Sequence, residues 1–158
     1  MRHRSEQRTH QTRDALMGIV TWSDELYGTG HETIDGQHKR LIQMINDLHD
    51  SLAKGQVTEG MKSTLKGIVE YTQTHFADEE KIMEELGWPE LDEHRRKHHA
   101  LLRDVRKMLM RLKSGETVGP FELLGFLRQW LLEHIEGEDL KLRKVIKTSS
   151  ATKSPKPV

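Results

Sequence analysis

The chain has 158 residues, a length that fits one domain with a sizeable hydrophobic core. Lys plus Arg and Asp plus Glu each number 25, so the balanced charge gives no reason to expect a nucleic acid as partner. Cysteine is absent, which excludes disulfides and thiolate metal sites, and no apolar run approaches the roughly 18 residues of a membrane span.

The first 20 residues contain four arginines among polar residues and show no apolar period, so we predict a flexible N-terminal arm. Four stretches with helical periodicity follow, bounded by glycines and prolines. The predicted helices are about 34–53, 58–86, 89–113 and 120–146. From residue 148 onward, small polar residues and two prolines predict a disordered tail, residues 148–158.

The loops between these helices are short, and short loops favour antiparallel neighbours. No stretch shows the alternation of apolar and polar residues that is typical of strands. We therefore expect residues 21–147 to form an all-α domain, an up-down-up-down antiparallel four-helix bundle.

Every predicted helix carries potential metal ligands on its apolar stripe. In chain order, these ligands are His38, then His75 and Glu79, then His94 and His98, then His134 and Asp139. The three pairs are separated by four, four and five residues, or about one helical turn, so both members of a pair can reach one common point. Five imidazoles are too many nitrogen donors for calcium, and seven ligands are too many for one zinc.

A single histidine on an apolar stripe is usually a core residue whose ring is hydrogen-bonded. Seven ionisable groups on four stripes are different, because burying them without a metal would cost several kcal/mol for each unpaired charge. His31, His49 and His99 lie in loops or off the stripes and are not expected to be ligands. In the acidic run 78–85, only Glu79 is four residues from His75, so it alone is predicted to point inward.

The spacing of His134 and Asp139 is unusual, because five residues of ideal helix separate two side chains by about 140°. Gly137 lies between them, and we expect it to permit a local widening of the helix. Asp35 and the glutamates near the ligands are candidates to orient the imidazole N–H groups from outside.

The candidate ligands lie in four segments, which read IDGQHKRL around His38, HFADEEKIM from His75, HRRKH from His94 and WLLEHIEGED up to Asp139. With these segments, the chain resembles the hemerythrins, and most of all the single-domain bacterial hemerythrins, over about residues 20–146. The set is specific, since it demands residue type, spacing and order across four helices.

The resemblance implies two non-haem iron ions joined by a bridging oxo or hydroxo group. In such a centre Glu79 and Asp139 would bridge both irons. One iron would take His94, His98 and His134, and the other would take His38 and His75, with one position left for dioxygen as ligand. The resemblance also implies an apolar oxygen pocket, lined by Leu41, Phe76, Trp130, Leu131 and Ile135.

The function implied is reversible dioxygen binding for transport, storage or delivery, and not an enzymatic activity. We expect a cytoplasmic monomer without membrane insertion, which would pass oxygen to an oxygen-consuming enzyme. Three alternatives remain open at this point: a di-iron enzyme that detoxifies peroxide or nitric oxide, an oxygen sensor that signals through the arm or tail, and a metal-free helical scaffold.

Overall fold

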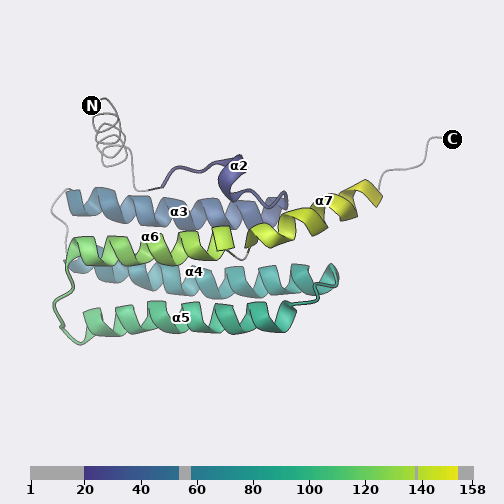
Figure 1. The fold of residues 1–158 in the computed structure, drawn as a ribbon. Coiled ribbons are helices and arrows are strands. Elements are labelled where there is room, and N and C mark those ends of the chain that lie inside the picture. Colours follow the sequence, from purple (N-terminus) through teal and green to yellow (C-terminus); the bar gives the residue numbers. More distant parts are fainter. Residues whose placement is uncertain (1–19, 54–57, 138, 153–158) are drawn as a thin grey trace, which may run out of the picture.

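The structure is a computed structural model that describes residues 20–53, 58–137 and 139–152. Four long helices lie side by side in it (Figure 1): α3 (Glu32–Ala53), α4 (Thr58–Glu85), α5 (Leu91–Lys113) and α6 (Pro120–Gly137). A short helix, α2 (Asp24–Tyr27), precedes them, and a 3-10 segment, η1 (Asp139–Lys141), and α7 (Leu142–Thr152) follow. The predicted arm, except for Val20, and residues 153–158 of the predicted tail lie outside the described residues.

The four long helices form a closed ring of neighbours. α3 packs against α4 and α6, and α5 packs against α4 and α6. Consecutive long helices run in opposite directions, so the predicted up-down-up-down bundle is confirmed. None of the described helices is both long and apolar enough to cross a membrane.

Two of the predicted helix ends are built on glycine. Gly87 after α4 and Gly115 after α5 have φ angles of 67° and 82°, a left-handed conformation that glycine adopts without steric cost. After α4, the N–H groups of Gly87 and Trp88 donate to the carbonyl oxygens of Glu84 and Met83. This Schellman arrangement satisfies carbonyls that the helix end would otherwise leave unpaired.

The fourth predicted helix differs from the expectation. It was expected to continue through about residue 146, but α6 ends at Gly137 and the 3-10 segment begins at Asp139. The α-helix is therefore interrupted at the place where a local widening was expected. α7 then extends to Thr152, past the boundary near residue 147 that the composition predicts.

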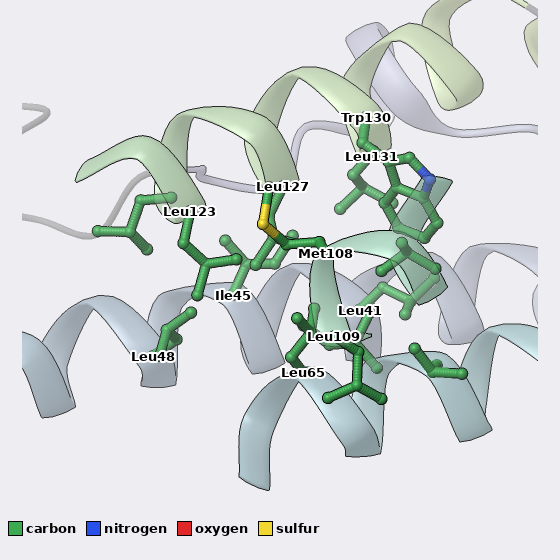
Figure 2. Close-up of a cluster of buried hydrophobic side chains, with 14 of the residues drawn as sticks. Leu41, Ile45, Leu48, Leu65, Met108, Leu109, Leu123, Leu127, Trp130 and Leu131 are labelled. Atoms are coloured by element: carbon green, nitrogen blue, oxygen red, sulfur yellow. The ribbon is translucent and has the colours of Figure 1, made fainter. Parts of the chain in front are cut away.

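The apolar core lies on both sides of the candidate ligands. On one side is a large cluster, to which all four long helices contribute, for example through Leu48, Leu65, Leu109 and Leu123 (Figure 2). On the other side is a small cluster of Ile34, Met83, Leu142 and Ile146. The stripes that bury these residues also carry the candidate ligands, so packing of the core brings the ligands together.

Candidate metal centre

All seven predicted ligands meet inside the bundle. α3 supplies His38, α4 supplies His75 and Glu79, α5 supplies His94 and His98, α6 supplies His134, and η1 supplies Asp139. None of these side chains is more than 5% exposed. The end of α6 and the start of η1 place both His134 and Asp139 inside the bundle, although an unbroken helix would turn them apart.

The ligand atoms form two overlapping groups, in each of which one candidate atom per residue lies within 4.8 Å of the others. One group contains His38, His75, Glu79, His134 and Asp139. The other contains Glu79, His94, His98, His134 and Asp139. Both carboxylates belong to both groups, which is the property that two neighbouring cations sharing bridging ligands require.

The two oxygens of Glu79 face different halves of the cluster. Oε2 lies 3.5 Å from His75 Nε2 and 3.7 Å from His38 Nε2. Oε1 lies within hydrogen-bond distance of His94 Nε2 and 3.1 Å from His98 Nε2. The carboxylate therefore spans the gap between the two groups of histidines.

Asp139 spans the same gap from the other side. Its Oδ2 lies 2.8 Å from His38 Nε2 and 3.0 Å from His134 Nε2. Its Oδ1 lies 3.4 Å from His94 Nε2. Asp139 Oδ2 alone therefore lies near histidines of both halves, and both carboxylates lie between the two groups of histidines.

Many of these buried atoms have no hydrogen-bond partner among the described residues. They are His38 Nδ1 and Nε2, His75 Nε2, Glu79 Oε2, His134 Nδ1 and Nε2, and both oxygens of Asp139. His38 Nε2 approaches Asp139 Oδ2 to 2.8 Å without hydrogen-bond geometry, so the two atoms are aimed at a shared point and not at each other. Unpaired buried polar atoms are costly, and cations coordinated by the Nε2 atoms and the carboxylate oxygens would satisfy those that face the cluster.

The carboxylates also shift the pKa values of the histidines. Burial lowers the pKa of His38 and His94, but Asp139 and Glu79 outweigh burial and raise both pKa values to about 9. At His75, burial dominates and lowers the pKa to about 3.

The histidines in turn hold both carboxyl groups ionised. Burial raises the pKa of Glu79, but the nearby His38, His94 and His98 outweigh it and hold that pKa well below its usual range. Burial and Glu79 raise the pKa of Asp139, but the lowering effects of His134 and His38 are larger and hold that pKa below its usual range. In the chain alone, the raised pKa values of His38 and His94 therefore favour positive charge beside the two carboxylates.

Groups outside the cluster orient two of the imidazoles. His75 Nδ1 donates to Gln37 Oε1 at 2.7 Å, and Gln37 Nε2 donates to Asp78 Oδ2 at 2.7 Å. His98 Nδ1 donates to Glu80 Oε1 at 2.7 Å. Because Nδ1 carries the proton in each ring, Nε2 keeps its lone pair for the interior of the cluster.

The expected orienting residues are only partly the right ones. Glu80 is one of the glutamates near the ligands, none of which was singled out, and it does contact a ring. Asp35 does not, because its carboxylate accepts from the Thr29 N–H and hydroxyl and from the Gly30 N–H at the start of α3. Gln37 was missed, since nothing within α3 indicates that its amide reaches His75 on the neighbouring helix.

The five residues of the predicted pocket are all buried in the core: Leu41, Phe76, Trp130, Leu131 and Ile135. Phe76 stacks on the ring of His98, with a centroid separation of 3.8 Å and an interplanar angle of 3°. Trp130 donates its indole N–H to the carbonyl oxygen of Leu101. Packing around the cluster is thus dense, and oxygen binding beside it stays a prediction.

The family model described as "Hemerythrin HHE cation binding domain" matches residues 29–146. The bacteriohemerythrin of Pseudomonas aeruginosa is 39% identical over 123 residues, which cover 78% of each chain. The myohemerythrin of Theromyzon tessulatum is 30% identical over 120 residues, covering 76% of this chain and 88% of the relative. A crystal structure of wild-type hemerythrin superposes with a TM-score of 0.74 at 27% identity, covering 81% of this chain and 98% of that one.

Proposed function

Because the chain belongs to the hemerythrin family, we propose that it binds dioxygen reversibly at a centre of two non-haem irons. The observation that carries this proposal is the arrangement of Glu79 and Asp139, each of which lies between histidines of both halves of one buried cluster. A site built for one cation would not need two shared carboxylates.

His134 belongs to both groups of side chains, and the family resemblance assigns it to the second iron in the proposed ligand sets. His38 and His75 would hold one iron, and His94, His98 and His134 would hold the other, with both carboxylates bridging. When bound, the irons supply the electrons that hold dioxygen reversibly. The outer contacts of Gln37 and Glu80 turn imidazole lone pairs toward the interior, and thereby preorganise the set.

The composition of the cluster favours reversible binding over oxidation of a substrate. Di-iron carboxylate proteins that use paired Glu-x-x-His elements are rich in anionic ligands. This cluster has five imidazoles and two carboxylates, and fewer anionic donors stabilise high-valent iron less well. The burial of all seven side-chain ligands also keeps water away from the centre. Water there would promote the loss of bound dioxygen.

The first test is the iron content and the absorption spectrum of the purified protein. We expect two irons per chain, and an absorption band that appears when oxygen is added to the reduced protein and disappears on deoxygenation. Fewer than two irons, or the absence of a reversible band, would contradict the proposal. Steady turnover of peroxide or nitric oxide without such a band would favour the detoxifying enzyme instead.

A second test concerns the pocket wall. Leu131 lies on α6, three residues before His134, and is 1% exposed. Leu131→Ser is expected to admit water and to accelerate autoxidation of the oxygenated protein about tenfold, because a polar side chain lowers the cost of hydrating the pocket. The decay of the oxygenated spectrum measures the rate, and an unchanged rate would remove Leu131 from the pocket.

A further inference from the structure

One polar side chain lies in the apolar layer beside the cluster. Leu41 is three residues after His38 on α3, and Leu131 is three residues before His134 on α6. Because α3 runs opposite to α6, both steps lead in the same direction along the bundle, by about 4.5 Å. The two leucines therefore occupy one layer.

α4 contributes Thr72 to this layer. It lies three residues before His75, and α4 runs parallel to α6, so the step from ligand to layer has the same direction and length. Side chains of a helix lean toward its N-terminus, so the ring of His75 extends toward the turn that carries Thr72.

Thr72 is fully buried, and its Oγ1 has no hydrogen-bond partner among the described residues. A threonine inside a helix often bonds back to the carbonyl four residues earlier, but this hydroxyl does not. Leaving a hydroxyl unpaired in an apolar interior destabilises the fold. A partner supplied by a molecule that enters the layer would remove this penalty.

We propose that Thr72 is a polar subsite of the ligand pocket, where its hydroxyl donates a hydrogen bond to a small diatomic or anionic ligand. The inference rests on the proposed function, because it assumes a cation centre at the cluster. Leu41 and Leu131 offer such a ligand only apolar contact, so a single donor among them fixes its orientation. A hydroxyl without charge suits ligands that gain negative charge at the centre.

The test uses azide, a three-atom anion, titrated into the iron-loaded oxidised protein and followed by absorption. Thr72→Val and Thr72→Ala both remove the hydroxyl, and both are expected to weaken azide binding about tenfold. Thr72→Ser keeps the donor and should stay within about twofold of the parent protein. Thr74→Val is the matched control on the same helix, because Thr74 is exposed, and it should leave azide affinity unchanged.

A second readout is the thermal stability of the protein after chelation. Thr72→Val replaces an unpaired hydroxyl by a methyl group of similar volume, so the Tm should rise by about 3 °C. If the hydroxyl already has a partner in the core, the Tm of Thr72→Val should fall instead, and such a fall would overturn the inference.

Iron content separates the two possible failures. Two irons per chain with unchanged azide affinity in both Thr72→Val and Thr72→Ala would overturn the role of Thr72 and leave the proposed function intact. A parent protein that binds fewer than two irons would overturn both.

Discussion

The bundle interior has an apolar part and a polar part, and the two are held together in different ways. In the large apolar cluster, residues such as Leu48, Leu65 and Leu123 are 0% exposed and belong to one group of packed side chains from different helices (Figure 2). In the metal cluster, equally buried groups leave eight of their polar atoms unpaired among the described residues. The same four helices thus carry one part that packs by itself and one part that needs a ligand.

The stability of each part depends on a different physical property. Packing of the apolar cluster depends on volume, and removing atoms from it creates cavities. The metal cluster depends on charge, because two carboxylates need positive charge from cations or from protonated His38 and His94. Changes in metal or pH should therefore act on one part and leave the other unaffected.

The largest effect is expected when a bridging carboxylate is removed. Glu79→Ala should prevent assembly of the two-iron centre, because Glu79 is the α4 side chain whose oxygens face both groups of histidines. The measured iron content should fall from two irons per chain to at most one. Two irons in this variant would show that Glu79 does not bridge.

Leu65→Ala is the matched change in the apolar part of the same helix. It should destabilise the protein by about 2–5 kcal/mol, both with iron and after chelation, because the cavity does not depend on the metal. Its iron content should remain at two. A loss of iron in Leu65→Ala would show that the two parts are not independent.

A smaller effect is expected from pH on the chelated protein. His38 and His94 have pKa values raised to about 9, so their contribution to stability is complete below pH 6.5 and is lost as the pH rises to 9. The lowered pKa of His75 acts only below pH 6.5, so it does not oppose this trend. Each histidine contributes at most about 1.4 kcal/mol per pH unit.

Urea unfolding of the chelated protein between pH 7 and 9 measures this loss of stability. The iron-loaded protein is the control, since cations replace the protons there and the slope should be nearly flat. Equal slopes with and without iron would contradict the idea that protons substitute for the metal.

The smallest effect is expected from the contact that orients His75. Gln37→Leu removes the acceptor of the His75 Nδ1 proton and should weaken iron binding about 10-fold to 100-fold. Gln43→Leu is the matched control, because the Gln43 amide is exposed and donates to Asp47 on its own helix, away from the ligands. Competition with a chelator measures the affinity. Equal affinities in the two variants would reduce Gln37 to a packing residue.

Much of the fold was predictable because its signals are local. Stripes of apolar residues with a 3.6-residue period predict the four helices, and Gly87 and Gly115 mark two of their ends. The same stripes contain His38, His75 and the other candidate ligands, so burial of the core predicts their convergence. The interruption after Gly137 was predicted only as a widening, because spacing indicates a departure from ideal geometry and not its form.

The sequence alone determined which side chains share the interior, because the position of a residue on its own helix depends only on the helical period. Only the tertiary structure decided which oxygen of Glu79 faces which histidines, and that Gln37 and not Asp35 supports a ring. It also decided that the Thr72 hydroxyl has no hydrogen-bond partner in the described part of the chain. These contacts join different helices, so they depend on how the packed helices are rotated and displaced relative to one another, and no local pattern encodes this.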